Sequence, residues 1–438
     1  MATNGTTAPV DHIVVLMLEN RSFDHMLGFL YADSNNRSPA GDTFEGLTGA
    51  ESNPDASGNP VSVFKIEADR PNAYYMPGAD PGEGYAATNH QLFGTKTVSS
   101  SAKPTNAGFV TDFAETLGWQ SKEGRSIVPG TTGNDIMGCY TPEALPVLSA
   151  LARGYAVCDH WFCSVPTETL PNRAFTCTAT SQGHMDDHTR VFTAPSVFGL
   201  LSANGLDWRV YGYQELPLSR LTFTDITHAT PEHFGVFTDF QRAAAAGTLP
   251  AFTFLEPSWS STGNSQHPNY DVAAGEQLIH DVYRALRDGP GWPRTLFVLT
   301  YDEHGGCYDH VPPPSGATPP DTAIGEFGFD FTRFGPRVPA VLVSPYIPAG
   351  TVFRVADGGV PLDHTSILKT VQTRWDLPGL TARDKAAPDV FAALSLAAPR
   401  ADDPLANVTV PVAHEPNPAA AEQSHLQQVH EELTARFL

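Results

Sequence analysis

The chain has 438 residues, of which 41% are hydrophobic and 10% aromatic, so a substantial core can form and a disordered chain is excluded. A formal net charge of −22 and an isoelectric point near 5.0 disfavour nucleic acid and anionic membrane surfaces as partners, and no Lys/Arg run offsets that charge. No apolar run is long enough to span a membrane. Met1–Asp11 lacks the basic and apolar regions of a signal peptide, so the localisation stays open between the cytoplasm and export with a signal removed or by an unconventional route.

Short apolar runs that end in polar residues recur along the chain and predict buried strands of a parallel sheet. In chain order they are 13–18, followed by Glu19-Asn20; 155–157, followed closely by Asp159-His160; 208–211; 251–255, followed by Glu256; 295–300, followed by 301–304; and 338–343, followed by Ser344. Apolar residues at helical spacing predict helices over 143–153 and 273–287. This alternation predicts an α/β fold with a central, largely parallel sheet flanked by helices. Ligands of such sheets bind at the carboxyl ends of the strands, where these polar residues lie.

The remaining stretches predict loops and a tail. Residues 33–108 are rich in Gly, Pro, Asn and Ser and are expected to fold over the site as a loop-rich cap, and residues 309–333 are similar in composition. Residues 386–421 are rich in Ala and Pro, and residues 422–438 predict a short amphipathic helix packed on the main domain. We therefore expect a main domain over 10–385, followed by a linker and helix over 386–438.

The five cysteines match no zinc-finger spacing, and their odd number leaves at least one thiol unpaired within a monomer. We expect most of them to be small buried side chains, with one disulfide still possible.

Two of the predicted strand ends carry the residue types of a divalent-metal site. Glu19 and Asn20 offer hard oxygen ligands, and the amide of Asn20 can also donate to a phosphoryl oxygen. Asp302-Glu303-His304 ends another strand, and the following Gly305-Gly306 permits a tight turn with positive φ. Carboxylates crowded in a cleft repel one another unless a cation neutralises them. The alternatives are a strand-end turn at Asn20 and a solvated acidic turn at Asp302.

A third segment, residues 164–173, offers a hydroxyl nucleophile. Thr169 precedes Pro171, and Pro is favoured in the first turn of a helix, so Thr169 is expected at a helix N-terminus that attracts anions. A hydroxyl there, beside a metal, is a plausible nucleophile, and Arg173 could neutralise a phosphate oxygen or pair with a carboxylate. The alternative is an ordinary Thr cap of a helix.

Hydrolysis of a phosphoester also needs a proton donor for the leaving oxygen, and histidine is the usual choice. Of the 16 histidines, five stand in suggestive contexts: His90, His233, His267, His304 and His364. His267 lies in a Gly/Ser/Asn/Pro loop shortly after the strand that precedes Glu256, and it is the best placed as a catalytic residue.

Several ordered segments resemble one known family. Residues 12–30 (HIVVLMLENRSFDHMLGFL) resemble the opening motif of the phosphoesterase family that contains bacterial phosphatidylcholine-type phospholipases C, plant non-specific phospholipases C and a bacterial acid phosphatase. Residues 300–314 (TYDEHGGCYDHVPPP) are similar to its most specific motif. Further likeness covers 137–173, 249–257, 267–286, 337–346 and 363–375, so that the resemblance spans roughly residues 10–385.

The resemblance implies a sheet like that of alkaline phosphatases, one divalent metal and a phosphorylated Ser/Thr intermediate. By position, the metal ligands would be Glu19, Asn20, Thr169, Asp302 and Glu303, with Thr169 also the nucleophile. The resemblance would also place His90, His233 and His267 in the phosphoryl pocket. To these we add Asn20 and Arg173, for the reasons given above, and His304 as a further catalytic candidate. The family commonly has Gly-Pro-Thr where this chain has Thr167-Glu168-Thr169, which leaves Thr167 as a rival nucleophile and adds a negative charge at Glu168.

These residues predict a metal-dependent phosphoesterase that acts through a phosphothreonine. Phospholipase C-type hydrolysis of a diester such as phosphatidylcholine is the first hypothesis, and acid phosphatase action on small monoesters is the second. A catalytically silent ligand-binding relative is the third, although Thr169, Asp302 and Glu303 are all present. The motif that sulfatases modify is not found. The metal could be Ca²⁺, Mg²⁺, Mn²⁺ or Zn²⁺.

Overall fold

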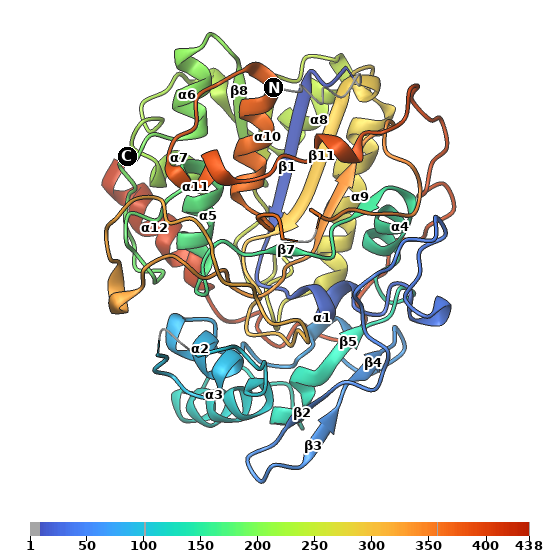
Figure 1. The fold of residues 1–438 in the computed structure, drawn as a ribbon, viewed down its shortest axis with the longest axis vertical. Coiled ribbons are helices and arrows are strands. Elements are labelled where there is room, and N and C mark those ends of the chain that lie inside the picture. The colour runs from blue at the N-terminus through green and yellow to red at the C-terminus, as the bar shows by residue number, and fades with distance from the viewer. Residues whose placement is uncertain (1–8, 100–101, 357, 438) are drawn as a thin grey trace.

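The centre of the molecule is an eight-stranded sheet in a computed structural model that describes residues 9–99, 102–356 and 358–437. In spatial order its strands are β13 (Thr351–Val352), β6 (Ala156–Val157), β12 (Ala340–Val343), β11 (Thr295–Tyr301), β1 (His12–Leu18), β10 (Phe252–Leu255), β8 (Trp208–Gly212) and β9 (Phe234–Val236). β1 and β11 consist almost wholly of buried residues, as expected for strands covered on both faces. The sheet runs through the middle of the molecule (Figure 1).

Strand direction follows the prediction at the centre of the sheet and departs from it at one strand. β1 pairs in parallel with both β10 and β11, and β10, β8 and β9 continue in parallel. β12 is antiparallel to both of its neighbours, β11 and β6. The expectation that the run 338–343 is parallel to the others, with Ser344 at the ligand-binding edge, is therefore wrong, because the reversed strand carries Ser344 to the opposite edge.

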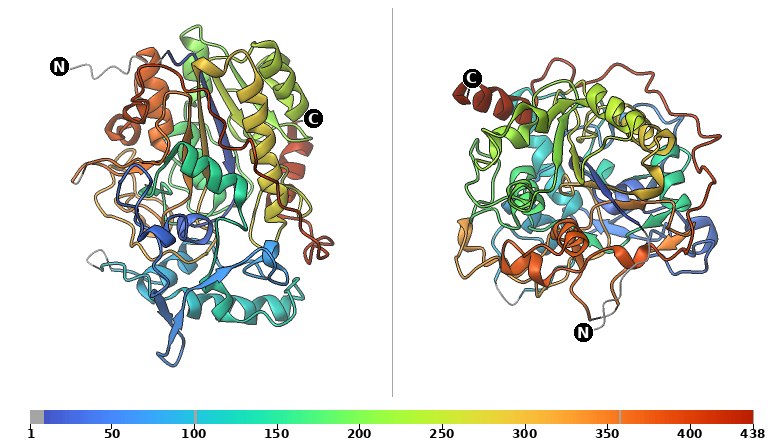
Figure 2. Two further views of the ribbon diagram at one scale, coloured as in Figure 1. Left: turned by 90° about the vertical axis from the view of Figure 1, so that its right-hand side faces the viewer. Right: turned by 90° about the horizontal axis from the view of Figure 1, so that it is seen from above.

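Helices cover both faces of the sheet. α4 (Pro146–Gly154), α8 (Phe237–Ala246) and α9 (Val272–Asp288) pack together on one face, and α5 (Thr169–Thr178) and α10 (Thr365–Trp375) pack together on the other (Figure 2). The shorter helices of the main domain are α1 (Phe23–Leu27), α6 (Val197–Ala203), α7 (Leu218–Thr222) and α11 (Ala382–Ala386). The predicted α/β fold with a largely parallel sheet flanked by helices is thus confirmed.

A smaller layer lies beyond the carboxyl ends of β1 and β11, at the bottom of Figure 1. It holds α2 (Tyr85–Phe93), α3 (Phe109–Glu123), the ribbon of β2 (Ser52–Pro54) with β3 (Pro60–Ser62), and the pair β4 (Phe64–Ile66) with β5 (Gly138–Tyr140). A further pair, β7 (Trp161–Phe162) with β14 (Leu362–Asp363), belongs to the main domain. We call residues 48–140 the cap layer. It includes α3 and β5, which follow the stretch 33–108 where we expected the cap.

The end of the chain returns to the cap layer. The C-terminal helix α12 (His425–Phe437) begins three residues later than predicted. Before it, Glu415 accepts a hydrogen bond of 3.1 Å from the backbone N–H of Asn72, and Glu422 accepts one of 2.5 Å from that of Ser126. The tail therefore holds the cap layer and the main domain together.

All five cysteines are buried and free, so no disulfide forms in this structure. Among the described residues, no helix combines the length and apolar character that crossing a membrane requires.

Candidate active site

The ends of β1 and β11 bring the two predicted acidic segments together. The two strands pair in register as far as Leu18 and Tyr301, so Glu19-Asn20 and Asp302-Glu303 leave the sheet side by side. The backbone N–H of Asn20 donates to Asp302 Oδ1 at 3.0 Å. Asn20 has a φ of +55°, which an asparagine adopts more easily than most residues, and this turn projects its side chain away from the strand.

The glycines after Glu303 allow a close approach. Gly305 and Gly306 have φ of +60° and +63°, as the sequence predicted. A Cβ on Gly305 would lie 2.0 Å from the carbonyl oxygen of Asn20, and one on Gly306 would lie 2.5 Å from that of Gly82 in the cap layer. The turn is therefore packed between the end of β1 and the cap layer, and a side chain at either position would separate them.

Thr169 is the first residue of α5 and contacts this cluster. Its hydroxyl donates to Asn20 Oδ1 at 3.0 Å, while the next backbone N–H, of Leu170, donates to Asp187 Oδ1 at 2.6 Å. The hydroxyl of Thr167 instead donates to the carbonyl of Met185 at 2.7 Å. Of the two threonines that the sequence left open, the structure brings Thr169 to the acidic cluster.

Arg173, one turn further along α5, links the helix to the same cluster. Its Nε donates to Asp302 Oδ2 at 2.9 Å, and its Nη2 donates to the carbonyls of Met17 and Leu18, both at 3.1 Å. Its Nη1 is buried without a hydrogen-bond partner among the described residues. A guanidinium held by three such bonds keeps one donor free for an anionic oxygen.

The two glutamates of the cluster are buried and incompletely paired. Glu19 is 2% exposed and Glu303 is fully buried, yet Glu19 Oε2 and Glu303 Oε1 have no hydrogen-bond partner within the described chain. Burial raises the pKa of Glu19 to about 7, despite the opposing effect of His267 nearby. Burial and the neighbouring Asp302 also raise the pKa of Glu303 well above its ordinary value. Two buried oxygens without partners, in a set made of oxygen donors, fit a hard divalent cation.

Two other groups of side chains bring their potential metal-ligand atoms close together. Three such atoms lie within 4.8 Å of one another in two sets of the described residues: Asp24, Asp309 and His310, and Asp80, Glu83 and His267. In the first set Arg337 already neutralises both carboxylates, at 2.8 and 3.0 Å. The second set adjoins the acidic cluster, because the Asn20 side-chain amide donates to Glu83.

His267 is the predicted histidine that lies beside the cluster. Its Nε2 is 3.8 Å from Glu83 and 3.9 Å from Asp80, while Nδ1 contacts the carbonyl of Pro268 at 3.0 Å. Its loop is anchored to the end of β1, since the backbone N–H of Glu19 donates to the carbonyl of Ser265 at 2.9 Å. The ring therefore presents Nε2 toward the carboxylates that the cap layer contributes.

His304 is buried within the cluster rather than facing open space. Its ring nitrogens contact Glu303 at 3.1 Å and Gln91 of α2 at 2.7 Å, and burial lowers its pKa to about 3. Both ring nitrogens of His304 are thus already engaged within the cluster in this structure.

The other two predicted histidines are not brought to the cluster. His90 faces α3, where its ring contacts Asp112 at 3.2 Å and Thr111 at 3.3 Å. His233 stacks on Trp208 at 4.1 Å and contacts the carbonyl of that residue, at the start of β8. The start of a parallel strand lies at the edge of the sheet opposite the ligand-binding edge. Neither ring is placed to line a phosphoryl pocket in this structure.

Three residues near the centre were not assigned from sequence. Glu83 and Gln91 come from the cap layer, whose sequence has no periodic hydrophobic pattern or motif that points to function. His364 was noted only for its context, and its Nε2 contacts the backbone carbonyl of Asp302 at 2.5 Å.

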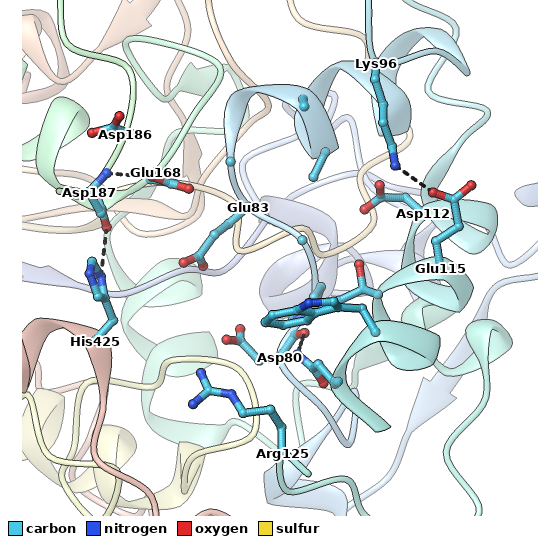
Figure 3. Close-up of a pocket in the computed structure, with 18 of the residues that line it drawn as sticks. Asp80, Glu83, Lys96, Asp112, Glu115, Arg125, Glu168, Asp186, Asp187 and His425 are labelled. Atoms are coloured by element: carbon cyan, nitrogen blue, oxygen red, sulfur yellow. Dashed lines mark hydrogen bonds and ion pairs between the residues drawn. The ribbon is translucent and has the colours of Figure 1, made fainter. Parts of the chain in front are cut away.

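A cleft of about 790 Å³ opens between the cap layer and the loop before α5 (Figure 3). Its charged lining consists of seven carboxylates, two cations and two histidines: Asp80, Glu83, Asp112, Glu115, Glu168, Asp186, Asp187, Lys96, Arg125, His188 and His425. Trp119, with 54% of its surface exposed, also lines it. Burial and four neighbouring carboxylates, with Asp80 first, raise the pKa of Glu83 well above its ordinary value. A cation that entered this space would relieve that crowding.

Fold and geometry together define an α/β protein whose acidic centre, at the carboxyl ends of a parallel sheet, holds a threonine hydroxyl at a helix N-terminus. The profile of the phosphoesterase family matches residues 10–378, and the chain belongs to that family. It is accordingly an enzyme, a phosphoric ester hydrolase.

Curated relatives match over most of their length. Non-specific phospholipase C1 of Arabidopsis thaliana is 36% identical over 86% of this chain and 69% of its own, and non-specific phospholipase C3 is 34% identical over 94% and 78%. Phospholipase C A of Mycobacterium tuberculosis is 30% identical over 90% and 79%. A solved protein of the alkaline phosphatase superfamily from Vibrio parahaemolyticus shares 11% identity with a TM-score of 0.34, over 56% of this chain and 63% of that one.

Proposed function

We propose that this enzyme hydrolyses a phosphodiester in the manner of a phospholipase C, with Thr169 as its nucleophile. The observation that carries the proposal is the Thr169 hydroxyl at the N-terminus of α5, 3.0 Å from Asn20 and beside the partly unpaired Glu19 and Glu303. The positive end of the helix dipole at the N-terminus of α5 favours an anionic phosphoryl group. The relatives named as phospholipases C support the choice of reaction.

Each residue of the site would have a separate role in the reaction. Glu19, Asn20, Asp302, Glu303 and Thr169 would hold one divalent cation, which when bound favours the ionised hydroxyl and neutralises phosphoryl charge. Thr169 Oγ1 attacks phosphorus, the bond to the leaving alcohol breaks, and a phosphothreonine forms. Water then attacks phosphorus and frees the threonine.

Two side chains assist these steps. Nη1 of Arg173 is available to a phosphoryl oxygen, because the other nitrogens of its guanidinium are held by Asp302 and the backbone of β1. His267 stands next to the cluster and is the candidate donor of the proton that the leaving alcohol takes up.

The charge of the cleft favours a diester with a cationic head group over a monoester. A phosphomonoester carries close to two negative charges at neutral pH, and seven carboxylates line the cleft, among them Glu168, which precedes Thr169 in the chain. A choline-type diester has one phosphoryl charge and one compensating ammonium. The exposed face of Trp119 is a suitable neighbour for such a cation. Acid phosphatase action is the alternative outcome of the test below.

The test is a paired assay on p-nitrophenyl phosphorylcholine and p-nitrophenyl phosphate, with and without a chelator, for wild type, Thr169→Ala and Thr167→Ala. We expect preference for the choline diester, loss of activity with the chelator and with Thr169→Ala, and retention with Thr167→Ala. Preference for the monoester would assign the acid phosphatase reaction to the same site. Activity that survives Thr169→Ala would show that Thr169 is not the nucleophile.

A further inference from the structure

Glu83 joins the cap layer to the centre of the site. It lies in the loop just before α2, 64 residues after Glu19 in the chain, yet the side-chain amide of Asn20 donates to its Oε2. The same carboxylate oxygen is 3.8 Å from Nε2 of His267. Glu83 therefore contacts a proposed metal ligand and approaches the proposed proton donor, and it is the residue of the cap layer that does both.

Glu83 also faces the acidic cleft. Figure 3 shows its side chain in the space between the cap layer and the loop that carries Glu168. The two loops approach closely, because a Cβ on Gly84 would lie 2.7 Å from Glu168 Oε1. A side chain at position 84 would therefore displace the carboxylate of Glu168. One side of Glu83 thus contacts the reaction centre, and the other faces the cleft that would receive the head group.

We propose that Glu83 is a specificity-determining residue: it orients Asn20 and presents negative charge to a cationic head group of the ammonium class. This rests on the phosphodiesterase function proposed above. Because the amide nitrogen of Asn20 donates to Glu83, its carbonyl oxygen is directed to the hydroxyl of Thr169. The Glu83 carboxylate contacts Asn20 on one side and lines the cleft on the other. A cation in the cleft favours its ionised form, so an ammonium is attracted there and a second phosphoryl charge is repelled.

The two parts of this role are separated by the choice of substitution. Glu83→Gln keeps a side-chain oxygen that accepts from Asn20 and removes the charge, whereas Glu83→Asp keeps the charge on a shorter side chain. Glu115→Gln is the matched control, because Glu115 lines the same cleft but pairs with Lys96 at 2.9 Å. If Glu83 only positioned Asn20, its loss would affect every substrate equally.

The experiment measures kcat and KM of the four proteins with p-nitrophenyl phosphorylcholine and p-nitrophenyl phosphate, and inhibition of the diesterase reaction by free choline. For Glu83→Gln we expect the ratio of kcat/KM, choline diester over monoester, to fall about 10- to 100-fold, mainly through KM for the diester. Choline should inhibit the wild type and Glu115→Gln, and it should inhibit Glu83→Gln far less. Glu83→Asp should keep the preference for the diester.

Four results would overturn the assignment. An equal loss of kcat/KM with both substrates in Glu83→Gln would mean that Glu83 only positions Asn20. An unchanged ratio in Glu83→Gln, or the same fall in Glu115→Gln, would remove its role in selectivity. In these three cases the wild type still turns over the diester, so the proposed function stands. A wild type that turns over neither substrate would overturn the proposed function, and this assignment with it.

Discussion

Glu19→Gln should stabilise the metal-free protein at alkaline pH. Glu19 is buried, its Oε2 has no partner in the described chain, and its pKa rises from 4.5 to about 7. The folded protein therefore binds this proton more tightly than the unfolded chain does. The resulting stability is complete below pH 4.5 and is lost as the pH rises through 7. A rise from 4.5 to about 7 corresponds to about 3 kcal/mol of unfolding free energy.

The measurement is urea unfolding of chelator-treated wild type and Glu19→Gln at pH 5 and pH 8.5, followed by tryptophan fluorescence. The unfolding free energy of the wild type should fall relative to that of the variant by up to about 3 kcal/mol between the two pH values. Added Mn²⁺ or Ca²⁺ should restore the wild type at pH 8.5 and affect the variant less. Glu143→Gln, at an exposed position, is the control and should follow the wild type.

The reasoning would be refuted if wild type and Glu19→Gln lost stability in parallel between pH 5 and pH 8.5. Parallel curves would mean that Glu19 is ionised at little cost in the metal-free fold. The crowding of unpaired carboxylates would then no longer argue for a cation at this position.

Three further substitutions test other parts of the structure. Thr169→Ser should keep measurable diesterase activity because serine retains the hydroxyl, whereas Thr169→Ala should lose at least about 1000-fold in kcat. An equal loss of kcat in both variants would contradict the proposed role of Thr169. Gly305→Ala should lower the unfolding free energy by about 2–4 kcal/mol and reduce kcat, because its Cβ would lie 2.0 Å from the carbonyl of Asn20; normal urea unfolding would argue against that packing. Glu276→Ala should lower the unfolding free energy by about 2–3 kcal/mol, because the buried carboxylate accepts hydrogen bonds from the N–H groups of Val147 and Leu148 at 2.6 and 3.0 Å. A thermal unfolding midpoint equal to that of wild type would contradict this stabilising role.

The centre of the sheet could be predicted because β1 and β11 are long, apolar and followed at once by acidic residues. Parallel pairing then required Glu19 and Asp302 to meet at one edge. The direction of β12 could not be predicted in the same way. A buried run of four residues shows that a strand is covered on both faces, but its direction depends on the loops around it.

Polar residues at strand ends are also not all functional. Glu256 follows β10 as expected, but it accepts the backbone N–H groups of Leu218 and Ser219 at 2.6 and 2.9 Å and so caps α7. The positions of His233 and Glu83 could not be predicted from the sequence either. Each is placed by tertiary packing of a loop, which takes His233 to Trp208 and Glu83 to Asn20, and neither outcome has a periodic signature in the sequence.

Three contacts of the cap layer with the end of β1 and the turn after β11 come from one short stretch of chain. Gly82 touches the turn at Gly306, Glu83 binds Asn20, and Gln91 binds His304, all within ten residues. If Glu83 selects the head group as proposed, this stretch carries both a contact that joins the cap layer to the site and the selectivity of the cleft. Exchanging residues 82–91 between relatives would then transfer head-group preference as one unit, without any change in the sheet.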